Sequence, residues 1–162
     1  MCSSHLLFHP NGKIKKFGDS GGGGGVKEII NLFCAFRMKL YEKRKKRQLE
    51  VARHSHLVAS QKFSFLSAVM NDELVVHRRK KDEIEDDMQA MEFVKLDDSF
   101  DYLLRLNILS FTEEKLKTLK DEIEKISGHI ESLESTLPAD MWKDELETFL
   151  VEYEKWERSM AY

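Results

Sequence analysis

Apolar residues between positions 116 and 137 repeat at alternating steps of three and four residues. They are Leu116, Leu119, Ile123, Ile126, Ile130, Leu133 and Leu137. Three heptads of this kind place a narrow apolar row along one helix, with charged or small residues nearly everywhere else. A helix that packs on a globular core usually carries a wider apolar stripe. The pattern therefore predicts a coiled-coil seam that another helix must cover.

A second long helix is predicted over residues 26–70, which contain no proline and no glycine. Its apolar positions recur at helical spacing, and a helix of this length needs a partner to cover them. The segment 110–113 fits a capping box that begins the seam helix, and Pro138 ends or kinks that helix. Beyond the proline a further helical stripe follows. It consists of Trp142, Leu146, Phe149, Tyr153 and Trp156.

These elements predict a mainly α fold, with a long antiparallel helical hairpin (a coiled coil), a small globular tip and a short N-terminal β-hairpin. Asn11-Gly12 supplies the turn of that β-hairpin, and five consecutive glycines make the next segment a flexible linker. The expected organisation has five parts. They are the β-hairpin 1–17, the linker 18–25, the first arm 26–62, the tip and dimerisation region 63–110, and the returning arm 111–162, kinked at Pro138.

The net charge of −3 over 162 residues conceals a strong asymmetry. Residues 26–81 hold 14 Lys and Arg against 5 Asp and Glu, whereas residues 82–110 hold 2 against 9 and residues 111–162 hold 7 against 14. The basic and acidic parts could pair with each other, or the basic part could lie near a nucleic acid. Seven basic residues fall between Arg37 and Arg47, where a solvated helix face is the plainer interpretation.

The residues predict no catalytic, cofactor or metal site. His54 and His56 are two positions apart, which directs them to different faces of a helix. The acidic run 82–87 lacks the glycine and the spacing of a calcium loop, and Cys2 and Cys34 have no metal-type spacing. No run approaches the roughly 20 apolar residues that span a bilayer, and no signal peptide is expected. On residues alone, the chain reads as an interaction element in a reducing compartment.

An ordered set of segments resembles the carboxy-terminal part of the breakage-and-reunion core of eukaryotic DNA topoisomerase II. The most specific are the Asp-Tyr-Leu-Leu segment at 101–104 and the Pro-x-Asp-x-Trp-Lys-x-x-Leu segment at 138–146. The full set is Phe8–Phe17, Phe33–Lys46, Glu73–Ile84, Phe100–Leu104, Leu109–Lys115 and Leu137–Leu146. The chain departs from the family at the glycine run, and at Asn107, where the family has proline.

The resemblance implies the coiled-coil exit gate, or C-gate, in which the tips of two subunits meet and part to release a DNA duplex. It implies a homodimer, transient non-specific contact with duplex DNA, no membrane partner and a nuclear location. Candidate tip or dimer residues are Phe63, Phe65, Leu66, Val69, Leu103, Leu104 and Leu106. Candidate DNA-facing residues are Arg37, Lys43, Arg44, Lys46 and Arg47.

The parent family hydrolyses ATP and uses Mg²⁺, but the resemblance places the ATPase domain, the metal-binding domain and the nucleophilic tyrosine outside this sequence. We therefore expect a catalytically inactive chain with no cofactor of its own. The alternative is a stand-alone coiled-coil adaptor that binds a partner helix through its seam.

Overall fold

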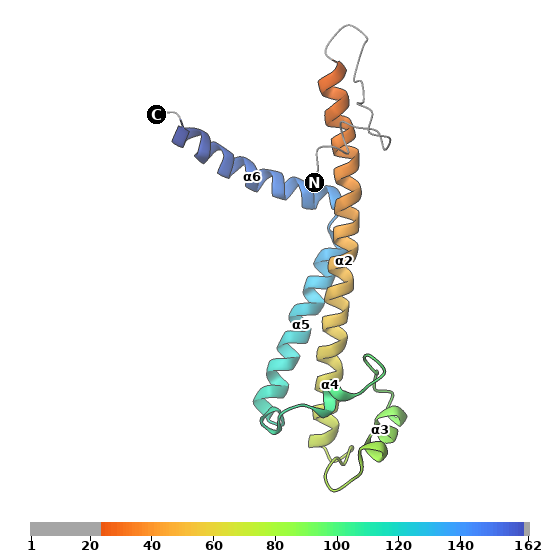
Figure 1. Ribbon diagram of the computed structural model, residues 1–162. Coiled ribbons are helices and arrows are strands. Elements are labelled where there is room, and N and C mark those ends of the chain that lie inside the picture. Colours follow the sequence, from red (N-terminus) through yellow and green to blue (C-terminus); the bar gives the residue numbers. More distant parts are fainter. Residues whose placement is uncertain (1–23, 161–162) are drawn as a thin grey trace. The chain divides into compact units, whose positions relative to one another are not determined.

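The computed structural model describes residues 24–160, which are mainly helical (Figure 1). This confirms the predicted mainly α class. Within residues 24–160 no strand occurs, and one isolated β-bridge joins Leu96 and Ser99. The β-hairpin predicted at 1–17 lies outside the described residues. The helices are α2 (Gly24–Met70), α3 (Lys81–Ala90), α4 (Asp101–Leu104), the 3-10 turn η1 (Ile108–Ser110), α5 (Glu113–Ser135) and α6 (Pro138–Met160).

Helix α2 begins two residues before the predicted start of the first arm. Gly24 and Gly25, which were predicted to belong to the linker, form part of its first turn. From Val26 onward, α2 meets no proline or glycine before its end at Met70. An uninterrupted helix of 47 residues is therefore consistent with the local sequence.

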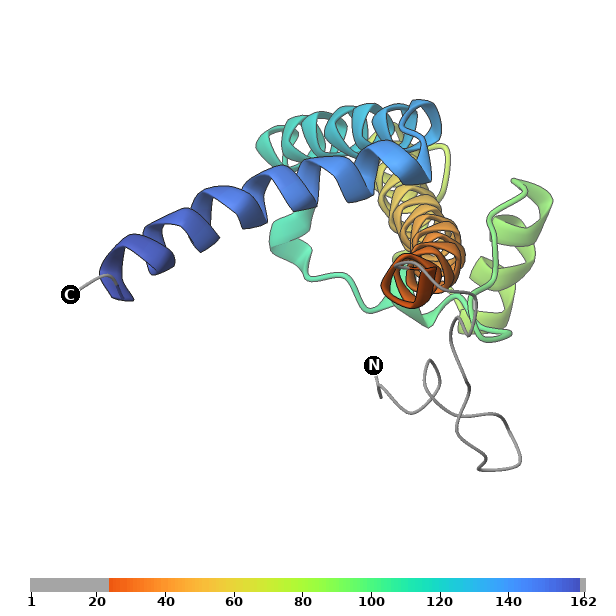
Figure 2. The ribbon, with the colours of Figure 1, turned by 90° about the horizontal axis from the view of Figure 1, so that it is seen from above.

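The chain forms two compact units, and α2 contributes to both. One unit contains the described residues 24–47 and 136–160, and the other contains residues 48–135. Within the second unit, Arg53 of α2 forms an ion pair of 2.6 Å with Glu134, near the end of α5. Leu119, from the first half of α5, joins the buried cluster at the far end of α2. The two helices are therefore antiparallel in this unit, side by side (Figures 1 and 2).

A small apolar core lies where the end of α2 meets α3, α4 and α5. Phe100, Leu103 and Met88 are almost completely buried in it. Full burial of one such side chain contributes roughly 1.5–3 kcal/mol, so these short elements are held by a shared core rather than by their own helix propensity. The buried members are Phe65, Leu66, Ala68, Leu74, Ile84, Met88, Phe100, Leu103 and Leu119.

Helix α2 ends in a turn that needs a left-handed residue. Asp72 has φ 58°, and the N–H of Glu73 donates to the carbonyl of Ala68 at 2.9 Å. This is the hydrogen-bond pattern of a Schellman cap, whose left-handed position usually holds glycine. Helix α3 ends in the same way at Glu92, with φ 61°. Two charged residues therefore occupy positions where glycine is less strained.

The start of α5 differs from the predicted capping box. Ser110 belongs to η1, and α5 begins at Glu113. The hydroxyl of Thr112 accepts a hydrogen bond from the N–H of Lys115 at 3.3 Å, and its carbonyl accepts from the N–H of Leu116. Thr112 is therefore the N-cap, because the 3-10 turn delays the helix by two residues.

Candidate helix-pairing and nucleic-acid surfaces

The residues of the predicted seam, apart from the last, lie on the less exposed side of α5. Leu119 and Leu133 are buried, and the four seam residues from 116 to 130 other than Leu119 are half-buried. Leu137 does not belong to this row, since it follows the end of α5 and is 61% exposed. The helix stops at Ser135 because Pro138 starts a new helix, and a proline disfavours helical geometry in the residue before it.

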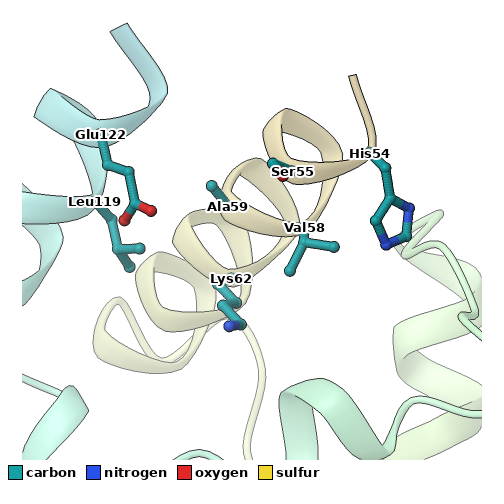
Figure 3. A pocket seen from close by; sticks show the side chains of 7 residues that line it. All are labelled: His54, Ser55, Val58, Ala59, Lys62, Leu119 and Glu122. Carbon is teal, nitrogen blue, oxygen red and sulfur yellow. The ribbon is translucent and has the colours of Figure 1, made fainter. Parts of the chain in front are cut away.

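A shallow groove of about 360 Å³ runs beside this helix pair. In Figure 3, Leu119 and Glu122 of α5 point toward Ala59, whereas the ring of His54 lies away from them. One histidine and one carboxylate on separate sides of a groove do not form a nucleophile–base pair or a metal site. Elsewhere in residues 24–160, no group of three or more His, Cys, Asp or Glu side chains is arranged to hold a metal ion. None of the described helices has the length and apolar character needed to cross a membrane.

The seven candidate tip residues fall into two classes of burial. Phe65, Leu66 and Leu103 are buried in the core, whereas the other four, Phe63, Val69, Leu104 and Leu106, pack partly buried against it. These residues therefore lie in the buried cluster of this unit or pack against it. The apolar side chains that the segment exposes are different ones, which the sequence pattern did not single out. They are Met70, Val75, Met91, Val94 and Leu109, the last of them 77% exposed.

The first unit is built around the buried ring of Tyr41, which is 2% exposed. Trp142 of α6 stacks on this ring with centroids 5.9 Å apart, and the Tyr41 hydroxyl donates a hydrogen bond to the carboxylate of Glu145. Burial raises the pKa of the Tyr41 hydroxyl, and the hydrogen bond to Glu145 raises it further. The same bond, followed by the contact with Arg44, lowers the pKa of Glu145.

Two of the predicted DNA-facing residues belong to this cluster. Arg37 lies over the Tyr41 ring at 5.2 Å, and Arg44 forms an ion pair of 2.6 Å with Glu145. Lys45, between the predicted positions, donates to the carbonyl of Thr136 at 2.8 Å. Arg44 therefore binds α6 directly, Arg37 packs on the tyrosine that α6 contacts, and Lys45 binds the residue two positions before α6 begins. The other predicted residues, Lys43, Lys46 and Arg47, are exposed, and so is Lys39. Lys39 was not among the predicted residues, although its spacing of four from Lys43 places the two on one helix face.

Beyond Trp142, the stripe predicted on α6 lies largely in solvent. The ring of Tyr153 packs at a tilt against Phe149 and against Trp156, with centroids 5.8 and 5.6 Å apart, and Trp156 is 54% exposed. A contiguous aromatic surface of this kind is typical of a protein-interaction face. In this unit, therefore, the first turns of α6 are docked and the later turns are uncovered.

Comparison with known proteins places these features in a family. The family model that describes the A subunit of DNA gyrase/topoisomerase IV matches residues 22–147. DNA topoisomerase 2 of Invertebrate iridescent virus 6 is 30% identical over 152 residues, which cover 91% of this chain and 13% of that protein. DNA topoisomerase 2 of Trypanosoma cruzi is 28% identical over 136 residues, which cover 84% and 11%. The chain thus spans about an eighth of the length of these curated relatives.

A solved structure shares the fold. The crystal structure of the Plasmodium falciparum topoisomerase II DNA-binding, cleavage and re-ligation domain matches with a TM-score of 0.74 at 24% identity, covering 94% of this chain and 23% of that one. The resemblance to DNA topoisomerase II predicted from sequence is confirmed. Because the family model matches most of its length, this chain belongs to the type II DNA topoisomerases, in the family of the DNA gyrase/topoisomerase IV A subunit.

Proposed function

We propose that this chain is the exit-gate, or C-gate, dimerisation module of a type II DNA topoisomerase. The observation that carries the proposal is the antiparallel pair of α2 and α5 with a closed apolar core at its end, in a chain of that family. In this proposal α2 and α5 are the coiled-coil arms, and residues 63–110 are the tip that meets a second copy.

The composition of the tip suits an interface that opens. Its largest apolar side chains are already used in the core, so the tip keeps its form when the partner leaves. Its surface is mostly charged, with scattered apolar residues such as Met91 and Leu109. Small and largely polar interfaces are weaker than obligate ones, and their association is reversible.

Sedimentation equilibrium of the purified chain tests the proposal. We expect a reversible dimer at micromolar concentration, and Leu109→Asp to weaken it at least tenfold because it places a carboxylate in the interface. Val51→Asp is the matched control, since Val51 is an exposed apolar residue of the same unit but lies outside residues 63–110. A chain that stays monomeric at high micromolar concentration would overturn the proposal.

Within a complete enzyme, the gate would pass duplex DNA transiently and without sequence preference. ATP hydrolysis and Mg²⁺-dependent cleavage would occur in other parts of that enzyme, with no cofactor held by this chain and no catalysis by it alone. A nuclear location would follow from the same role.

A second candidate function is an adaptor that binds a partner helix. The exposed aromatic surface of α6 favours it, and Phe149, Tyr153 and Trp156 are the residues concerned. The seam of α5 favours it less, because its residues from Leu116 to Leu133 are buried or half-buried. Capture of a helical partner that survives Ile123→Asp but is lost in Trp156→Ala would support the adaptor with α6 as its binding face.

A further inference from the structure

The basic run of α2 is divided between two sides of the helix. Positions 37, 41 and 44 follow one another at steps of four and three, so they share a face. Arg37 and Arg44 flank the Tyr41 ring at 5.2 and 5.6 Å, and Glu145 of α6 joins them. On this side Arg44 already has a carboxylate partner in Glu145, and Arg37 is half-buried over the Tyr41 ring.

Lys45 donates to the carbonyl of Thr136, and the other four cations of the run form a separate stripe. Its members are Lys39, Lys43, Lys46 and Arg47, which we call the basic stripe. At 3.6 residues per turn they fall within about 100° of one another, on the side of α2 away from Tyr41. All four side chains are exposed, and none forms an ion pair with any residue of the described range 24–160. Glu42 borders the stripe, about 40° around the helix from Lys46, and Glu50 follows on the same face one turn after Lys46.

The spacing of the basic stripe fits a polyanion with closely repeated charge. From Lys39 to Arg47 the helix rises about 12 Å, and duplex DNA presents a phosphate about every 1.7 Å along its axis. Three lysines act as point charges, and no Asn or Gln lies among them to read adenine. Such a set contacts phosphates without recognising sequence.

A membrane surface is the less favoured ligand. Basic helices that lie on lipid carry an apolar face along the whole basic segment. Here the exposed Leu32 and Phe36 precede the stripe on α2, and the face opposite the stripe is occupied by α6. The observations therefore favour nucleic acid.

We infer that the basic stripe of Lys39, Lys43, Lys46 and Arg47 contacts the phosphate backbone of duplex DNA, while Arg37 and Arg44 hold α6 in place. This inference rests on the proposed gate function, because a duplex that passes the gate supplies the ligand. It replaces the five predicted DNA-facing residues by four, removing Arg37 and Arg44 and adding Lys39.

The test measures anisotropy of a fluorescein-labelled 20-base-pair duplex titrated with the full chain at several salt concentrations. Four phosphate contacts predict a slope of log Kobs against log salt of about −3.6, which is about a 150-fold loss of affinity between 50 and 200 mM. The stripe variant carries Lys39→Gln, Lys43→Gln, Lys46→Gln and Arg47→Gln together. We expect it to lose at least tenfold in affinity at 50 mM salt and to have a slope near zero.

A charge-matched control removes four exposed lysines from α5. These are Lys115, Lys117, Lys120 and Lys125, each changed to Gln. We expect the control to bind DNA within twofold of the unchanged chain, and both variants to keep the helical circular dichroism spectrum. Equal losses in the two variants would overturn the inference, because net charge alone would then explain binding. Absence of binding by the unchanged chain at 50 mM salt would overturn it as well.

Two further measurements separate the possible failures. Binding to phosphatidylserine vesicles that matches DNA binding, and is lost in the stripe variant, would overturn DNA as the ligand in favour of a lipid surface. Sedimentation of the same samples reports the gate independently. If the chain is monomeric but its basic stripe still binds DNA, the proposed gate function is wrong and the DNA contact stands. If the chain dimerises but does not bind DNA, the gate function stands and the DNA contact is wrong.

Discussion

The hydroxyl of Tyr41 donates a hydrogen bond to the carboxylate of Glu145, 104 positions later in the chain. The contact fixes the first turns of α6 to α2, with Trp142 stacked on the same tyrosine ring. Arg37 and Arg44 complete the cluster from the α2 side. The most basic segment of the sequence therefore contributes to helix packing on one side and presents free charge on the other.

Acid should loosen this cluster. The pKa of Glu145 is lowered from its ordinary value of 4.5, mainly by the hydrogen bond from Tyr41. A lowered pKa stabilises the docked state above the unfolded value, and the contribution disappears as pH falls through the lower folded value. We expect docking of α6 to weaken below about pH 4.5. Fluorescence of Trp142 in a Trp156→Phe background measures it.

Alkali should loosen the cluster too, because the pKa of Tyr41 is raised from 10.0 by burial. The unfolded phenol then loses its proton first, so stability falls as pH rises past about 10. Tyr41→Phe should abolish the alkaline change and reduce the acid one. Glu147→Gln, on the same helix but outside the cluster, is the control and should leave the acid and alkaline changes in stability as they are. If both changes persist in Tyr41→Phe, the hydrogen bond between Tyr41 and Glu145 is not their cause.

A charge in the seam of α5 should destabilise the unit made by residues 48–135. We expect Ile123→Asp and Ile130→Asp each to cost about 2–3 kcal/mol, because a carboxylate would then face the apolar side of α2. Thermal unfolding followed by circular dichroism measures the loss. Lys125→Asp on the exposed face should change the stability by less than about 0.5 kcal/mol. Full helicity and unchanged melting in both seam variants would refute the internal α2–α5 pairing.

The N-cap of α5 distinguishes the observed turn from the predicted capping box. Thr112→Ala should cost about 1 kcal/mol, since the N–H of Lys115 loses its acceptor. Thr112→Ser should retain most of the stability. Ser110→Ala should have less effect, because Ser110 lies in η1 rather than at the cap. Urea denaturation of the three variants compares them, and a larger loss at Ser110 would restore the predicted cap.

Glycine should stabilise the fold more than the natural residue at the two positions where a helix ends in a left-handed backbone conformation. Asp72→Gly and Glu92→Gly should each stabilise the fold by about 0.5–1 kcal/mol, because a left-handed conformation is strained for residues with a Cβ. Asp86→Gly, inside α3, should instead cost about 1 kcal/mol. Midpoints of urea unfolding measure the three changes. Destabilisation at Glu92 would mean that its side chain contributes more than its strain costs.

Much of the helical organisation could be predicted because it depends on local periodicity. The heptad between Leu116 and Leu133 identified the helix and a row of its side chains that are buried or half-buried. Pro138 marked the break between α5 and α6, since proline acts on its immediate neighbours. The Thr112 cap was misplaced by two residues because a 3-10 turn and a helix start have similar sequences.

The burial of individual side chains in residues 63–110 and the partners of the basic residues on α2 could not be predicted in this way. Whether Phe65 lies in a core and Leu109 in solvent depends on how α3, α4 and α5 close over the end of α2. Both are apolar residues near helix ends, and periodicity does not separate them.

The long helices and the family could be inferred from repeat spacing and ordered motifs, which are properties of the chain. Which cations have a carboxylate partner depends on the packing of distant segments. Arg44 and Lys43 are neighbours of the same charge, but within residues 24–160 α6 brings Glu145 to Arg44, whereas Lys43 meets no carboxylate. A charge becomes available for a ligand through what packs against it, and that partner lies about a hundred residues away in the chain.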